Sequence, residues 1–248
     1  MDFYNNIADV YDAITHETQR REGAENFVSW LTKEYHIETV LDVACGAGLF
    51  TLEFARQNVR AIGIDIAKDL LNLASEKAAA ENLDIQFFDE PMQKSADVIN
   101  APADAIVCMG NSLPHLLEES DLTATLNEFD RLLKPGAPLV FHMLNYNRVL
   151  KQNERMVGVT KKNDVEFIRF YDFLEKKIRF NLLEVDWSHT PARTELCSTT
   201  LRPWTVDEVI EALSRHHFAE FETFGNLNRG HFDQDESEVL VLVAKKAN

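Results

Sequence analysis

The chain has 248 residues, and 45% of them are hydrophobic, which is enough to bury one substantial core. Acidic residues outnumber basic ones by 41 to 25, and the formal net charge is −16. Nucleic-acid binders neutralise phosphates with clustered Lys and Arg, so this balance argues against a DNA or RNA partner. It argues equally against an anionic membrane surface.

Targeting and metal-binding signals are also missing from the sequence. No run of about 18 apolar residues predicts a membrane span, and no basic region followed by an apolar run predicts a secretory signal. Cys45, Cys108 and Cys197 are far apart and form no C-x-x-C pair, which argues against a disulfide framework and a zinc site. We therefore expect a cytoplasmic protein with reduced thiols and no metal centre.

Strands and helices alternate over the first 150 residues. Apolar runs predict strands at 39–43, 61–65, 85–88, 103–109 and 139–144. Helical spacing predicts helices at 24–35, 49–57, 67–82 and 122–133, the last ending before Lys134-Pro135-Gly136. This alternation is typical of βαβ units and a parallel sheet.

The pattern changes after residue 150. From about 156 to 200, β-rich runs at 166–171, 178–185 and 194–201 predict an antiparallel insertion. Thr205 is placed to cap a helix over 206–216, and final strands are expected at 218–224 and 239–244. We predict a doubly wound, Rossmann-like, mostly parallel seven-stranded sheet. Its expected parts are a core with an N-terminal helical lid (1–150), the insertion (151–203) and the C-terminal part of the sheet (204–248).

The most informative segment joins the first strand to the helix at 49–57. It reads Asp42-Val43-Ala44-Cys45-Gly46-Ala47-Gly48, and glycines here let the backbone approach a ligand because no Cβ intervenes. The N–H groups of the following helix N-terminus point at that ligand. Asp65 ends the second strand, where a carboxylate can accept both ribose hydroxyls of a nucleoside.

Two ligand classes use this geometry. A dinucleotide site requires the third glycine of G-x-G-x-x-G, and Thr51 occupies that position. S-adenosylmethionine (SAM) carries no phosphate, so the turn needs to contact only a nucleoside and an amino-acid zwitterion. The D-x-x-C-G-x-G form favours SAM and leaves a nicotinamide-dependent oxidoreductase as an alternative.

Residues 41–48 resemble the first motif of class I SAM-dependent methyltransferases, and more narrowly of the glycine N-methyltransferase-like group. The resemblance covers nearly the whole chain, with further similar segments at 110–116, 132–136, 145–147 and 201–205. It implies an enzyme that moves the methyl group of SAM to a small-molecule acceptor by in-line displacement. A homodimer is one assembly open to such a chain.

The resemblance also implies which residues hold the cofactor. They are Tyr11 near the sulfonium, Arg21 at the carboxylate, Asp42, Ala44, Gly46 and Gly48 in the turn, Asp65 at the ribose, Ile66, Glu90 and Met92 around the adenine, and Met109, Gly110 and Asn111 after the fourth strand. Family members often have an acid where Pro91 stands, so Asp89 or Glu90 is the expected substitute.

The catalytic candidates are His115, His142 and Tyr11. Both histidines are expected near the C-terminal ends of strands four and five, where doubly wound sheets bind ligands, and imidazole titrates near neutral pH. A general base is needed only when the acceptor arrives protonated. Tyr11 resembles the aromatic residue that relatives place near the sulfonium.

The acceptor pocket departs from the pattern of the relatives that methylate glycine. Those relatives bind the substrate carboxylate with an arginine just before the Asn-Tyr pair, whereas this chain has Leu144 there. We therefore expect a different, partly apolar pocket. Its predicted wall consists of Asn111, Leu144, Tyr146 and the insertion aromatics Phe170, Tyr171 and Trp187.

Each assignment has a structural alternative. Asp42 and Asn111 can serve the turns alone, Arg21 can lie on a solvated face, and a histidine at a sheet edge can be a structural hydrogen-bonding group. For the whole protein, the alternatives are a catalytically silent SAM-binding scaffold and methylation of a protein substrate. Neither alternative changes the predicted fold.

Overall fold

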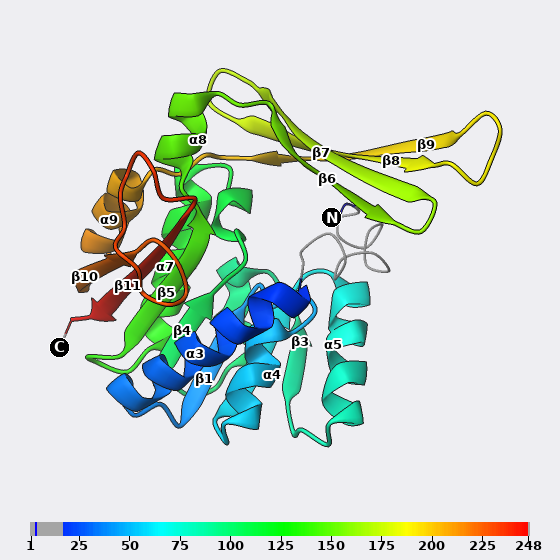
Figure 1. Cartoon of the computed structure of the whole chain (residues 1–248). Coiled ribbons are helices and arrows are strands. Elements are labelled where there is room, and N and C mark those ends of the chain that lie inside the picture. Colours follow the sequence, from blue (N-terminus) through cyan, green and yellow to red (C-terminus); the bar gives the residue numbers. More distant parts are fainter. Residues whose placement is uncertain (1–2, 4–16, 248) are drawn as a thin grey trace.

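The computed structural model describes Phe3 and residues 17–247, and it has two sheets. The larger sheet confirms the predicted fold class, because its strands form a mostly parallel seven-stranded layer (Figure 1). In sheet order the strands are β10 (Phe218–Phe224), β11 (Val239–Lys246), β5 (Pro138–Leu144), β4 (Ala105–Cys108), β1 (Thr39–Val43), β2 (Arg60–Asp65) and β3 (Gln86–Asp89).

The order of the strands creates a crevice at the carboxyl ends of β1 and β4. From β1 the chain proceeds to β2 and β3 on one side and then crosses back to place β4 on the other side. All of these neighbours pair in parallel, while β11 pairs antiparallel with both β5 and β10. Open α/β sheets bind ligands at such a reversal of strand order.

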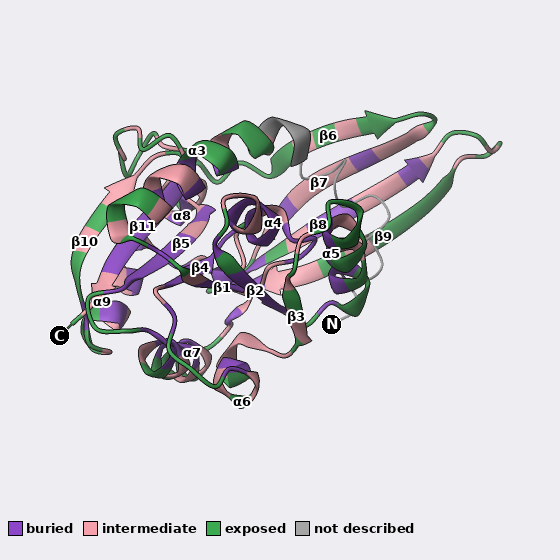
Figure 2. Ribbon diagram, turned by 90° about the horizontal axis from the view of Figure 1, so that it is seen from below, coloured by how far each residue is buried: buried purple, intermediate pink, exposed green. Residues whose placement is uncertain are grey.

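Helices cover both faces of the larger sheet. The helices are α3 (Glu17–Tyr35), α4 (Leu49–Arg56), α5 (Lys68–Ala80), α6 (Ser95–Val98), α7 (Glu119–Leu132), α8 (Tyr146–Gln152) and α9 (Val206–Ser214), with short 3-10 turns η2 (Met92–Lys94) and η3 (Leu113–His115). Val40 packs with α3 and α4, whereas its neighbour Leu41 packs with α7 and α9. Figure 2 shows the buried strands between these two helical layers.

The second sheet is antiparallel and contains β6 (Met156–Lys162), β7 (Val165–Phe173), β8 (Ile178–Asp186) and β9 (Arg193–Leu201) in that order. It extends from the core as a long arm (Figure 1). Phe3 packs against Phe167 and Leu182 of this sheet, and its ring lies 5.8 Å from that of Phe180. One face of the insertion therefore carries its own small apolar cluster.

Helix caps account for two differences between the predicted and the observed helices. Helix α7 begins three residues early because Glu118 and Asp121 form a capping box there. Thr205 caps α9 as expected, and Glu208 completes the box. No helix was predicted over 146–152, although Asn145 caps α8 there by accepting a hydrogen bond from the Arg148 N–H.

None of the described helices is both long and apolar enough to cross a membrane.

Candidate functional site

The turn between β1 and α4 forms the floor of the site. Ala44, Gly46 and Gly48 all adopt left-handed conformations, with φ of 60°, 55° and 81°. A Cβ on Gly48 would lie 2.7 Å from Leu52 Cδ1 and 3.0 Å from Ala74 Cβ, so only glycine lets α4 start this close to α5. This geometry exposes the backbone of the turn to whatever occupies the crevice.

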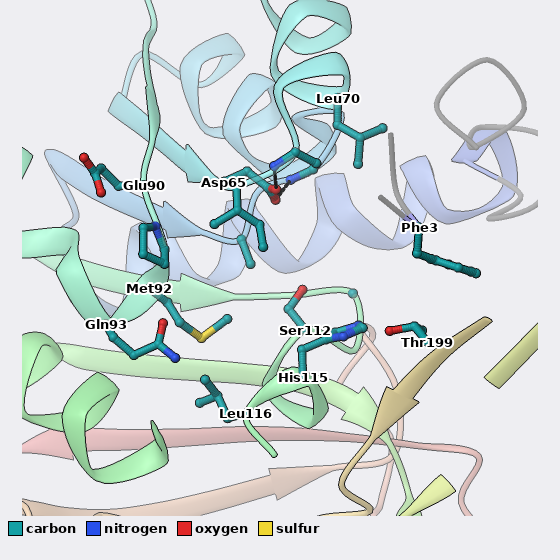
Figure 3. A pocket seen from close by; sticks show the side chains of 16 residues that line it. Phe3, Asp65, Leu70, Glu90, Met92, Gln93, Ser112, His115, Leu116 and Thr199 are labelled. Atoms are coloured by element: carbon teal, nitrogen blue, oxygen red, sulfur yellow. Dashed lines mark hydrogen bonds between the residues drawn. The ribbon is translucent and has the colours of Figure 1, made fainter. Parts of the chain in front are cut away.

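Asp65, at the end of β2, holds the turn in place. Its Oδ2 accepts a 2.7 Å hydrogen bond from the Gly46 N–H, and its Oδ1 accepts a 2.8 Å bond from the Ala67 N–H (Figure 3). Burial raises the pKa of this carboxyl, and the backbone hydrogen bonds oppose the rise. Each oxygen keeps a second lone pair, so the carboxylate can also accept hydrogen bonds from a ligand.

Asp42 lies deeper, beneath the turn, and is only 1% exposed. Its Oδ2 accepts a 2.5 Å hydrogen bond from the buried Thr51 hydroxyl. Its Oδ1 is buried and has no hydrogen-bond partner among the residues the structure describes. Burial raises the pKa of Asp42 to about 7. Thr51, which occupies the position of the third glycine of a dinucleotide motif, is therefore the residue that fixes this carboxyl.

Two connected cavities open above the turn. The main cavity encloses about 190 Å³ and is lined from the strand ends by Asp65, Ile66, Glu90, Met92, Gly110 and His115 (Figure 3). Phe3 and Thr199 of β9 also line it. The inner cavity is lined by Arg20, Asp42, Phe50 and Met109 among others, and it shares Ala44, Gly110 and Ser112 with the main one. The two cavities thus form one crevice across the ends of β1, β2 and β4.

Most of the predicted cofactor residues meet in this crevice. Those that line it are Asp42, Ala44, Gly46, Asp65, Ile66, Glu90, Met92, Met109 and Gly110. Pro91 and Gln93 line the main cavity as well. Gly48 supports the turn from below, and Tyr11 lies outside the described residues.

The arginine that lines the inner cavity is Arg20, the neighbour of the predicted Arg21. Arg20 lines the inner cavity, and its Nη2 would lie 3.8 Å from a Cβ built on Gly110. Arg21 is exposed, and its charge acts on Glu81. Successive helical residues point about 100° apart, so only one of the two arginines can face the crevice.

The predicted acceptor residues gather in a different place. Asn111 donates through Nδ2 to the Tyr146 hydroxyl at 3.1 Å and accepts through Oδ1 from the Leu144 N–H at 3.0 Å. Tyr146 and Tyr171 are buried together in one apolar cluster, against which Leu144 packs. These residues brace the ends of β4 and β5 and line neither cavity of the crevice.

Trp187 was also expected in the acceptor wall. It follows β8 directly and is 56% exposed, and it lines neither cavity of the crevice. Phe170 is likewise absent from both linings.

The two candidate histidines have different surroundings. His142 Nδ1 accepts a 3.3 Å hydrogen bond from the Gly110 N–H, and burial, assisted by the Arg20 charge, lowers the pKa of His142 to about 3. His115 lines the main cavity, and burial lowers its pKa to about 4. Both imidazoles are therefore neutral near pH 7, and only His115 meets the crevice.

The segments that form the crevice are also similar to those of known proteins. A family model described as a methyltransferase domain matches residues 40–136, which contain the turn, Asp65 and His115. A glycine/sarcosine N-methyltransferase of Aphanothece halophytica is 25% identical over 237 residues, covering 93% of this chain and 84% of that protein. A Geobacillus sp. (strain WCH70) protein named as a methyltransferase is 30% identical over 141 residues, or 56% of each chain.

The fold is also that of a solved SAM-dependent methyltransferase from Clostridium acetobutylicum. The TM-score is 0.84 at 15% identity, and the match covers 99% of both chains. The likeness therefore includes the insertion sheet as well as the larger sheet.

Proposed function

Because the chain belongs to the class I SAM-dependent methyltransferases, we propose that it transfers the methyl group of SAM to a small-molecule acceptor. One observation carries the proposal. The Asp65 carboxylate closes the Gly46 turn and at the same time lines the main cavity. A nucleoside with a free ribose diol fits this arrangement, because the carboxylate still has lone pairs to accept from hydroxyls.

The remaining crevice residues fit the other parts of SAM. Arg20 offers a cation to the amino-acid carboxylate, and the unpartnered Oδ1 of Asp42 offers an acceptor to the ammonium group. Ile66, Met92 and Leu116 supply apolar surface for the adenine. The inner cavity would then hold the methionine part and the main cavity the adenosine.

When bound, SAM supplies a methyl group on a sulfonium, which is transferred by in-line displacement. The residues of the chain mainly orient the reactants and exclude water. Phe3 and Thr199 line the main cavity from the insertion side, and Phe3 is anchored by its contact with Phe180. A closed, dry cavity favours the aligned geometry on which such a displacement depends.

The lowered pKa values of the two histidines favour a methyl acceptor that does not need to be deprotonated by a general base. A general base works best when its pKa is near the working pH, and the pKa of His115 is lowered to about 4. An amine can arrive neutral, whereas a hydroxyl generally needs a stronger base. We therefore favour an amine nitrogen as the methyl acceptor, with the neutral His115 as a hydrogen-bonding partner.

The proposal also covers the partners, the cellular location and the assembly of the protein. The net charge of −16 supports a protein that works without nucleic acid or membrane partners, and we place it in the cytoplasm. The insertion sheet exposes Val159, Trp187 and Leu196, which supports a homodimer formed through this arm.

The test is methyl transfer itself. Purified protein is incubated with SAM and a panel of small amines, acids and phenols, and S-adenosylhomocysteine is quantified. Acceptor-dependent product that disappears in Asp65→Asn, but persists in the exposed-acid control Asp84→Ala, supports the proposal. SAM binding without turnover of any acceptor would favour the silent scaffold instead.

A further inference from the structure

A third cavity leads from the crevice toward the insertion sheet. It is lined by Ile66, His115 and Leu117 on the core side and by Arg179, Ser198, Thr199 and Thr200 on the sheet. Ile66, His115 and Thr199 also line the main cavity. A molecule in this side cavity would therefore be next to the ligand in the crevice, in the position that a second substrate requires.

The side cavity carries one cation and no acid. Arg179 is its only charged lining residue among those described, in a chain whose acids outnumber its bases by 41 to 25. Thr200 lies directly opposite Arg179 in the β8–β9 ladder, so both side chains are on the same face of the sheet. The guanidinium and the threonine hydroxyl can thus donate hydrogen bonds to one group.

The acid opposite Arg179 forms no ion pair with it, although the Arg179 charge helps to lower the pKa of Asp172. Asp172 lies opposite it on β7, but the Asp172 carboxylate accepts from Asn181 Nδ2 at 3.0 Å and from Arg155 Nη2 at 2.7 Å. In the part of the chain that the structure describes, no acidic oxygen lies within ion-pair distance of Arg179. Ser198 already donates its hydroxyl proton to Asn181, so Arg179 and Thr200 are the donors that this face of the sheet offers to the side cavity.

We propose that Arg179 determines acceptor specificity by binding an anionic group, a carboxylate or a phosphate, on the methyl acceptor. This inference rests on the proposed function and adds the substrate class to it. Arginine binds such groups through two parallel N–H donors, and Thr200 adds a third. The acceptor's anionic end lies at Arg179, and its nucleophilic end faces His115 and the main cavity.

The experiment compares pairs of acceptors of which only one member carries an anionic group. The pairs are β-alanine with β-alaninamide, phosphoethanolamine with ethanolamine, and para-hydroxybenzoate with para-hydroxybenzamide. The first and third pairs test recognition of a carboxylate, and the second tests recognition of a phosphate. The wild type should prefer the anionic member of a pair by about 10-fold or more in kcat/KM. In Arg179→Ala this preference should vanish through KM, with kcat nearly unchanged, and Arg179→Lys should retain part of it.

The control variant is Arg193→Ala. It removes the same charge from the exposed start of β9, which does not line the side cavity, so the preference for anions should persist. Equal use of charged and neutral acceptors by the wild type, or an unchanged preference in Arg179→Ala, would overturn the proposal.

Two further results separate this inference from the proposed function. If no pair is methylated, the same acids are titrated calorimetrically into protein loaded with S-adenosylhomocysteine. Binding that Arg179→Ala abolishes supports the inference, and no binding of any acid contradicts it. Failure to bind SAM would contradict the proposed function instead, and the acid titration without S-adenosylhomocysteine then tests Arg179 in the same way.

Discussion

The Thr51 hydroxyl donates a 2.5 Å hydrogen bond to Oδ2 of Asp42, and both residues are almost completely buried. This contact joins the first turn of α4 to the strand that precedes the glycine turn. It leaves Oδ1 of Asp42 as a buried acceptor on the wall of the inner cavity. One side chain thus positions the carboxylate, and the other oxygen stays available to a ligand.

Replacing Thr51 with valine should therefore destabilise the protein. The substitution keeps the shape of the side chain but removes the hydroxyl donor of the buried Asp42 carboxyl, leaving only the Thr51 backbone N–H, and this costs about 1–3 kcal/mol. Urea unfolding measures the loss. Thr125→Val is the matched control, because the buried Thr125 hydroxyl bonds only to a helix carbonyl, that of Asp121. Equal losses in the two variants would argue against a special role for Thr51.

Asp42 should also make stability depend on pH. Its pKa rises from 3.8 to about 7 on folding, so the folded state binds the proton more tightly than the unfolded state. Protonation of Asp42 therefore stabilises the folded state fully below about pH 4. This stabilisation is lost as the pH rises toward 7, which changes the free energy of unfolding by an amount of order a few kcal/mol. His115 and His142 act in the opposite direction, because their folded pKa values are depressed.

The difference between wild type and Asp42→Asn isolates this contribution. We expect the wild type to lose stability relative to the variant between pH 4 and 7 in urea unfolding series, since the variant cannot titrate at this position. A constant difference across that range would show that Asp42 keeps an ordinary pKa.

Arg20 and Arg21 provide a matched pair on one helix. Arg20→Ala should weaken SAM binding by about 10-fold or more, because a charge-assisted hydrogen bond to the carboxylate is lost. Arg21→Ala should leave the dissociation constant nearly unchanged, since Arg21 is exposed. Calorimetric titration of both variants decides between the two arginines, and the reverse order of effects would assign the role to Arg21.

Gly48 and Gly23 should respond to alanine in opposite ways. At Gly48 a methyl group meets Leu52 and Ala74 at φ +81°, and we expect a loss of about 1–3 kcal/mol with reduced SAM affinity. Within α3, a Cβ on Gly23 makes only ordinary contact with Leu227, and alanine should add up to about 1 kcal/mol of stability. Thermal and urea unfolding test both substitutions, and a stable Gly48→Ala would refute the packing argument.

The sequence predicted the sheet well because each central strand is a continuous apolar run between turn residues. The turn at 42–48 and Asp65 could be assigned because their chemistry depends on backbone position, which strand order fixes. Helix α8 was missed because seven residues carry little periodicity, and its only clear signal is the Asn145 cap.

The direction of side chains was harder to predict from the sequence than the position of the backbone. Choosing between Arg20 and Arg21 requires the rotation of α3, which the sequence does not fix at a helix start. The sequence also carries no signal that Asn111 donates a hydrogen bond to the Tyr146 hydroxyl. Arg179 gave no motif signal, because its proximity to His115 depends on how the arm folds back over the crevice.

Binding of SAM in the crevice is tested by calorimetric titration of the purified protein with SAM and with S-adenosylhomocysteine, beside Asp65→Asn and Asp84→Ala. Circular dichroism first establishes that all three proteins are folded. We predict micromolar binding of both ligands by the wild type and by Asp84→Ala, and a loss of at least about 10-fold in Asp65→Asn. A folded wild-type protein that binds neither ligand, or an Asp65→Asn variant that binds as tightly as the wild type, would contradict the account.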